Sequence, residues 1–172
     1  MGLFSRTHFV ATRTGDYRLR LDADERDLLR SLPDQLEALL GQDGADAGAA
    51  GFGMVRLFPP AYLEEQELDA EYHRLMRSEL VSRRIEALGI VRETIDAERL
   101  SDEQLNAWMR VLNDVLLVLG TVLDVSEDTD PLDADPESAD YAQRVVYVVL
   151  SNLVGEAVDA LAGNLPPPSN PD

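Results

Sequence analysis

The chain has 172 residues, of which 45% are hydrophobic, as expected for one globular domain with a buried core. It contains no cysteine and no lysine, which excludes disulfides, thiolate chemistry and lysine nucleophiles. Its net charge of −18 disfavours nucleic acid and anionic membranes as partners. The first residues lack the apolar stretch of a signal peptide, so we expect a cytoplasmic protein.

The charge is unevenly distributed along the chain. Residues 1–20 carry four arginines against Asp16, whereas residues 121–172 carry eleven acidic side chains against Arg144 alone. All of the basic residues are arginine, a bias typical of GC-rich bacterial genomes.

Residues 8–21 alternate between apolar and polar side chains around a Thr14-Gly15-Asp16 turn, a pattern that predicts a β-hairpin. A lone hairpin is only marginally stable in water, so it needs a further strand or a covering helix. The segment 54–58 is the candidate third strand, because it is apolar and ends at a pair of prolines.

The first helix is predicted over residues 23–40. Asp22 is expected to cap its start and Gly41 to mark its end, while Pro33 is expected to break or kink it. The glycine- and alanine-rich segment 41–53 has no hydrophobic period and is predicted as a flexible loop.

The segments 61–77 and 78–96 are predicted as two helices, the second capped by Ser78, or as one bent helix. The acidic stretch 124–140 contains two prolines and is predicted as a solvated loop. A last helix is expected from its cap at Ser138 to about Leu161. The single domain would then cover 1–163, followed by a disordered proline-rich tail over 164–172.

The fold is expected to be built around residues 101–125. Ser101 and Gln104 stand at capping-box spacing, and apolar side chains then recur on nearly every side of the helix. Such a helix is a core helix or a membrane span, and its unbroken apolar run of about nine residues is too short for a span. The sequence therefore predicts a mainly α fold. It would be a helical bundle around one central buried helix, with a small N-terminal β-hairpin or three-stranded antiparallel sheet.

Polar residues interrupt this helix near its middle. Arg110, Asn113 and Asp114 need partners if they are buried, and Arg110 and Asp114 are four residues apart, so they can meet. We interpret them as a structural cluster, with a ligand or partner site as the alternative. Trp108 on the same turn is expected to be a core aromatic with its indole N–H satisfied.

Two groups of arginines are the remaining candidates for function. One lies on the hairpin and comprises Arg13, Arg18 and Arg20; the other lies on the predicted helix pair and comprises Arg74, Arg77, Arg83 and Arg84. Most such arginines pair with acids of their own chain. The alternative is a docking patch for an acidic partner or a local contact with nucleic acid, and Arg77 and Arg84 are the candidates on the helix pair.

No pattern for catalysis or metal binding is present. His8 lies near the start and His73 on a helix, without the further ligands at matched spacing that a metal site needs. No nucleophile elbow occurs, and adjacent acids are typical of a solvated helix face. We therefore expect no enzyme activity, no cofactor and no metal.

The run from Trp108 to Leu123, WMRVLNDVLLVLGTVL, resembles the conserved part of an actinobacterial family known as the domain of unknown function number two thousand and seventeen. The segment 57–62 and the opening hairpin followed by a helix are also similar. This chain departs from the family pattern at two positions: it has Leu117 and Val122 where the resemblance implies arginine. This chain therefore lacks two charges on its central helix, and any anion-binding role that they would carry.

The resemblance implies no activity. Genes of that family tend to lie beside the gene for the ClpS adaptor of the Clp protease, and some members are labelled transcriptional regulators. The expectation is a non-catalytic cytoplasmic protein that acts by protein–protein contact, linked to Clp-dependent proteolysis and forming a homodimer. The alternative is a transcriptional regulator that binds DNA through an arginine patch. A third hypothesis is an enzyme that uses Arg110, Asn113 and Asp114 in a pocket.

Overall fold

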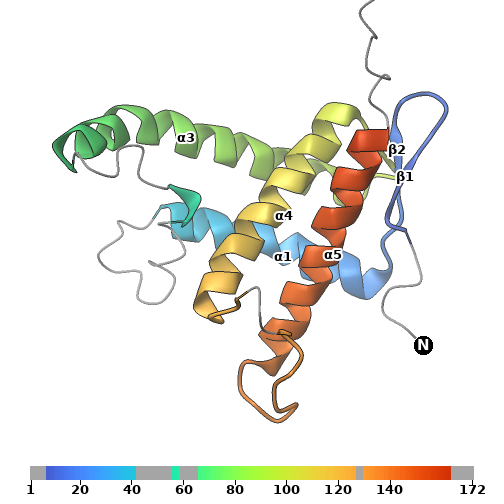
Figure 1. Cartoon of the computed structure of the whole chain (residues 1–172). Coiled ribbons are helices and arrows are strands. Elements are labelled where there is room, and N and C mark those ends of the chain that lie inside the picture. The colour runs from blue at the N-terminus through green and yellow to red at the C-terminus, as the bar shows by residue number, and fades with distance from the viewer. Residues whose placement is uncertain (1–6, 42–55, 59–65, 127–129, 164–172) are drawn as a thin grey trace, which may run out of the picture.

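The periodic segments of the sequence form helices around a small sheet in the computed structural model, which describes residues 7–41, 56–58, 66–126 and 130–163. Over these ranges the chain is mainly helical, with a small three-stranded antiparallel sheet near the N-terminus (Figure 1). The predicted loop 41–53 and the predicted tail 164–172 lie almost wholly outside the described residues.

The sheet has the order β1 (Phe9–Ala11), β2 (Tyr17–Leu19), β3 (Arg99–Leu100). The hairpin prediction is confirmed, with Phe9 opposite Leu19 and Gly15 in the turn at a φ of +85°, which glycine adopts without strain. The predicted third strand at 54–58 is wrong. Arg56 and Leu57 form a helical turn, residues 54–55 lie outside the described part, and β3 pairs with β2 instead.

Helix α1 (Ala23–Leu40) begins at a complete capping box, in which Asp22 accepts from the backbone of Glu25 and the Glu25 side chain accepts from the backbone of Asp22. Pro33 does not break it. The proline ring is buried among the apolar face of the helix, so packing offsets the hydrogen bond that proline cannot donate.

Helix α3 (Gln66–Thr94) is one continuous helix, so the alternative of a single helix holds over the region where two were predicted. Ser78 lies inside it and caps nothing. The C-terminal half of α3 contributes the buried residues Leu88 and Val91, whereas Leu68 and Leu75 near its start are exposed.

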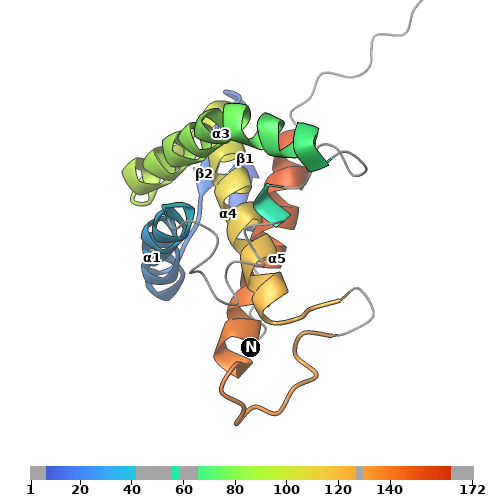
Figure 2. The same cartoon turned by 90° about the vertical axis from the view of Figure 1, so that its left-hand side faces the viewer.

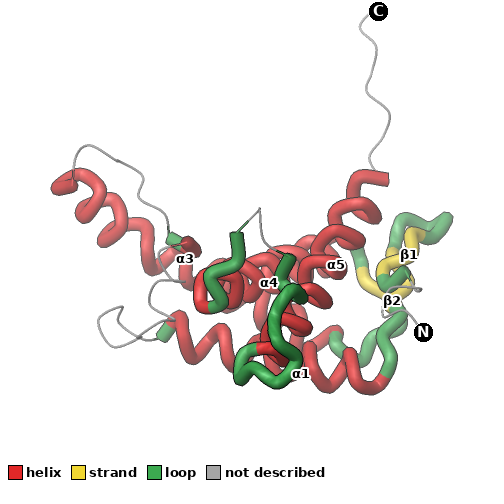
Figure 3. The backbone as a smooth tube through the Cα atoms, turned by 60° about the horizontal axis from the view of Figure 1, so that its bottom comes forward, coloured by secondary structure: helices red, strands yellow, loops and turns green. Residues whose placement is uncertain are grey.

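Helices α4 (Asp102–Val122) and α5 (Tyr141–Gly163) lie side by side in opposite directions, and α1 and α3 run across them (Figures 1 and 2). The sheet lies at one end of the helices (Figure 3). The Ser101–Gln104 capping box starts α4 as predicted. The predicted start at Ser138 is wrong, because α5 begins at Tyr141 and Ser138 lies in the preceding turn.

The core is centred on Trp108 of α4. Its ring is fully buried, meets Phe9 of β1 edge-on at a centroid distance of 6.2 Å, and donates its indole N–H to Thr94 Oγ1 at 2.8 Å. The expectation of an anchored core aromatic is therefore confirmed. In contrast, the C-terminal half of α4 is only partly covered, and Val122 is 39% exposed. The prediction that residues 101–125 are buried throughout therefore holds for most apolar residues of the first half, whereas in the second half only Val118 and Leu123 are buried.

Candidate protein-binding site

Arg84 of α3 and Asp114 of α4 form an ion pair between their helices. The Arg84 Nε donates to Asp114 Oδ2 at 3.0 Å, and its Nη2 donates to the backbone oxygen of Leu57 at 2.8 Å. The guanidinium also lies 4.7 Å from the centre of the Phe58 ring. Burial raises the pKa of Asp114, and the Arg84 charge partly opposes that rise.

Four of the six predicted site residues meet here. A small cavity of about 170 Å³ lies beside the pair and is lined by Leu80, Arg83, Arg84, Ala87, Arg110 and Asp114. Arg77 lies nearby, 5.7 Å from the Phe58 ring. The expected partner of Asp114 was Arg110, but Arg84 makes the hydrogen bond and Arg110 is exposed, acting on Asp114 only through its charge.

The other two predicted residues lie elsewhere. Trp108 is inside the core, and Asn113 is exposed on α4. The Arg84 guanidinium contacts a carboxylate, a carbonyl oxygen and an aromatic ring of its own chain, as expected for a residue that holds helices together. This cluster therefore joins α3 to α4, with Arg83 and Arg110 at its outer edge.

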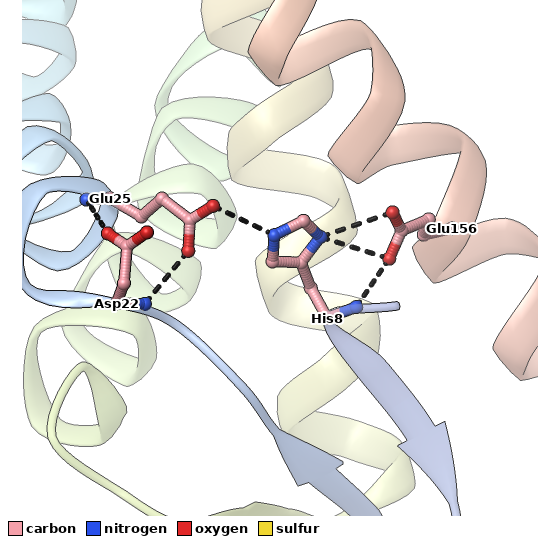
Figure 4. Close-up of polar contacts among 4 residues, drawn as sticks. All are labelled: His8, Asp22, Glu25 and Glu156. Atoms are coloured by element: carbon pink, nitrogen blue, oxygen red, sulfur yellow. Dashed lines mark hydrogen bonds and ion pairs between the residues drawn. The ribbon is translucent and has the colours of Figure 1, made fainter. Parts of the chain in front are cut away.

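His8 is a second polar contact, and the sequence analysis assigned it no role. Its ring lies between two carboxylates (Figure 4): Nδ1 is 3.1 Å from both carboxylate oxygens of Glu156, and Nε2 is 3.0 Å from Glu25 Oε1. The backbone N–H of His8 also donates to Glu156 Oε2 at 2.6 Å. This contact ties the residue before β1 to both α1 and α5.

The geometry around His8 favours a structural role. Ionised carboxylate oxygens only accept hydrogen bonds, so a ring that donates from both nitrogens satisfies both contacts. Within the described residues, no group of three His, Asp or Glu side chains is arranged to hold a metal ion.

An apolar groove opens where α1 diverges from α4 and α5. Its volume is about 420 Å³, within the range of pockets that bind ligands. It is lined by ten apolar and three uncharged polar side chains: Leu28, Ser31, Leu32, Gln35, Leu36, Leu39, Val115, Val118, Leu119, Val122, Ala142, Gln143 and Val146.

Two of the three polar side chains in this groove are already hydrogen-bonded. Ser31 Oγ donates to the backbone oxygen of Leu28 at 2.9 Å, and Gln35 Nε2 donates to Ser31 Oγ at 3.1 Å. Apart from these two uncharged polar side chains, the α1 wall of the groove is apolar. A surface of this kind, at the edge of the core and without charge, is typical of a contact site.

The sheet carries a different surface on its outer face. Arg18 of β2 stands directly opposite Arg99 of β3, and Arg20 follows on the same exposed side. Like charges at directly opposed positions destabilise a sheet. Asp16 reduces the repulsion between Arg18 and Arg99, because its carboxylate accepts a hydrogen bond from Arg99 Nη1 at 2.9 Å.

Comparison with known families gives one match. The model of a family described as a domain of unknown function, DUF2017, matches residues 6–161. The chain belongs to the DUF2017 family. Comparison with curated proteins and with solved structures gave no match.

In this DUF2017 protein, the run from Trp108 to Leu123 carried the resemblance to the family, and the fold gives several of its residues a structural role. Trp108 fills the core and Asp114 accepts from Arg84. Gly120 lets α5 approach closely, because a Cβ at this position would lie 2.9 Å from a ring carbon of Tyr147. Nothing in the structure explains Asn113.

By length and composition, helices α4 and α5 of the DUF2017 protein are apolar enough to cross a membrane. This is a weak indication, because the core helix of a soluble protein passes the same criterion. The two helices pack along one another and contribute to the core. Their incompletely covered surface includes the groove wall at Val115, Val122 and Val146.

Proposed function

We propose that this DUF2017 protein is a non-catalytic cytoplasmic protein that acts by binding another protein. The observation that supports this most is the open apolar groove between α1, α4 and α5, whose occupant we take to be a helix of the partner. Apolar side chains that face water in a shared groove lower the free energy when a partner covers them.

A non-catalytic role agrees with the state of the polar residues. Asp114 is committed to Arg84, and both ring nitrogens of His8 are committed to carboxylates. Both groups are therefore engaged in contacts within the chain.

The partner of this contact is proposed to serve Clp-dependent proteolysis. The support is the resemblance described in the sequence analysis, which implies a gene neighbourhood beside the ClpS adaptor, and the proposed role is one of contact and not of peptide cleavage. A homodimer through the same groove is the alternative arrangement, and light scattering at micromolar concentration distinguishes it from a monomer that binds a different protein.

The test is affinity purification from native cells with mass spectrometry, comparing wild type with Val122→Asp and Val158→Asp. Val122 lies in the groove, and Val158 is an equally exposed valine on α5 outside it. We expect at least one protein that wild type and Val158→Asp retain and that Val122→Asp loses. If no captured protein depends on Val122, the proposal is wrong.

A second candidate function is binding of nucleic acid, and the sheet supports it. Arg18 and Arg99 are kept opposite one another despite their repulsion, with Arg20 alongside. Such a patch suits a phosphate backbone, although the net charge of −18 opposes it at longer range. A gel shift at low salt tests it: retardation that Arg18→Ala abolishes supports this function, and no retardation excludes it.

A further inference from the structure

We infer that the groove binds an amphipathic helix whose flanking residues are basic. This inference rests on the proposed function and adds the chemistry of the partner. The shape of the groove, its lack of charge and the acidic loop beside it support this inference.

The two long walls of the groove have the spacing of helix-packing faces. On α1 the apolar residues Leu28, Leu32 and Leu39 recur along one side, and on α4 Val115 and Val122 do the same. Side chains three, four and seven residues apart are the positions that a neighbouring helix contacts. Both walls border the same groove, in which apolar side chains of a third helix can lie.

The length of the walls fixes the size of the occupant. Residues 28–39 of α1 rise by about 16 Å, which is three helical turns. A partner helix of about this length would place an apolar side chain on each turn into the groove. The α1 wall carries no charge and, being helical, presents no free backbone edge, so an extended strand, which needs backbone partners, fits less well.

The charge beside the groove identifies the flanks of that helix. The loop 124–140 begins two residues after Val122 and ends two residues before Ala142, so it joins two groove-lining positions. Its described residues hold six acidic side chains and no basic one: Asp124, Asp130, Asp133, Asp135, Glu137 and Asp140. Arg144, at the start of α5, is already paired with Asp140 at 2.8 Å and donates to Leu123.

An apolar floor with an acidic border complements a helix that has an apolar stripe and basic neighbours. A second copy of this chain fits less well. A symmetric contact through the groove would bring two of these acidic loops toward one another, and like charge opposes that approach.

The test uses two designed peptides and the full chain. Both peptides are about 14 residues long with leucines at helical spacing; one has arginine at the remaining positions and the other has glutamate. Fluorescence anisotropy at physiological salt measures their affinities. We expect the arginine peptide to bind at least about tenfold more tightly than the glutamate peptide.

Two variants separate groove binding from general attraction. Val122→Asp adds a negative charge, so purely electrostatic binding of the arginine peptide would strengthen, whereas groove binding is expected to weaken by about tenfold or more. Val158→Asp adds the same charge outside the groove and is expected to leave groove binding within about twofold. In the loop, Asp133→Asn with Asp135→Asn is expected to weaken binding and flatten its salt dependence.

The outcomes are distinct. If both peptides bind equally and Val122→Asp abolishes both, the groove is a docking site but the inferred basic partner is wrong. If Val122→Asp binds the arginine peptide as well as wild type does, the groove is not its site and the inference fails. A dimer that Val122→Asp dissolves would identify a second copy as the occupant, which also overturns the inference. If neither peptide binds, the inference fails, and affinity purification decides the proposed function separately.

Discussion

Arg84 and Asp114 connect the middle of α3 to the middle of α4 through a hydrogen bond of 3.0 Å. Both side chains are largely covered, at 22% and 13% exposure, and they lie beside the small cavity that Arg110 also lines. Because a carboxylate of this kind is desolvated, its charge is stable only while the guanidinium stays in place.

Breaking this pair is expected to destabilise the fold. Arg84→Met leaves Asp114 half-buried without its donor and should lower the free energy of unfolding by about 1–3 kcal/mol. Urea denaturation measures the change. Arg84→Met combined with Asp114→Leu should cost clearly less than the sum of the single changes, since neither charge is then left alone. Strict additivity would show that the two residues do not interact.

Thr94→Val is expected to lower stability by removing the acceptor of a buried donor. The Trp108 indole N–H would then be left without its partner at a fully buried position, at a cost of about 1–3 kcal/mol. Trp108 is the only tryptophan, so its fluorescence reports unfolding directly. Thr121→Val is the matched control, because Thr121 donates only to a helix carbonyl, and a change of about 0.5 kcal/mol is expected. Equal losses of stability in Thr94→Val and Thr121→Val would contradict the role of Thr94 as the acceptor for the Trp108 indole N–H.

His8→Ala is expected to cost about 2–3 kcal/mol, because it leaves Glu25 and Glu156 without the ring that both contact. A double-mutant cycle with Glu156→Ala should show coupling between the two residues. The control is Asp159→Ala, because Asp159 is exposed and lies on α5 like Glu156; this substitution should change stability little. Zero coupling between His8 and Glu156 would show that the contact contributes nothing to the fold.

Stability should fall on acidification, in part through Asp16. The Thr12 and Thr14 hydroxyls and then Arg99 donate to this carboxylate and hold its pKa well below the ordinary value near 3.8. The folded value lies below the unfolded one, so the contribution is present above the unfolded pKa and is lost as pH falls toward the folded pKa.

Asp16→Asn should remove this part of the pH dependence. The urea midpoint of the variant should therefore change less than that of wild type when pH falls from about 5 to about 2. Asp159→Asn controls for the loss of one exposed negative charge. Parallel curves for wild type and Asp16→Asn would contradict the role given to the Thr12, Thr14 and Arg99 contacts.

Local patterns predicted the helix starts at Asp22 and Ser101 and failed at Ser78 and Ser138. A capping box uses two residues three apart, so Asp22 with Glu25 and Ser101 with Gln104 are visible in the sequence itself. Strand β3 has only two residues, which is too short to show alternation, and the better-patterned segment 54–58 was chosen instead. Ser78 has the chemistry of a cap but lies within a helix that continues through it.

Contacts between distant segments were beyond reach. Glu156 is 148 positions from His8, and no local spacing links them. Arg110 was the expected partner of Asp114 because it lies on the same helix, yet α3 supplies a better-placed arginine. An all-round apolar pattern in α4 also does not tell whether a side chain is covered by its own chain, and Val122 is not.

The most direct measurement of the central claim is photo-crosslinking in living cells, with a photoreactive residue at position 122 in one strain and at position 158 in another. The two native valines are similarly exposed, at 39% and 45%, and only Val122 lines the groove. A groove that docks a partner predicts a discrete crosslinked species from position 122 that position 158 does not give. Identical crosslinking from both positions, or none from position 122, would contradict it.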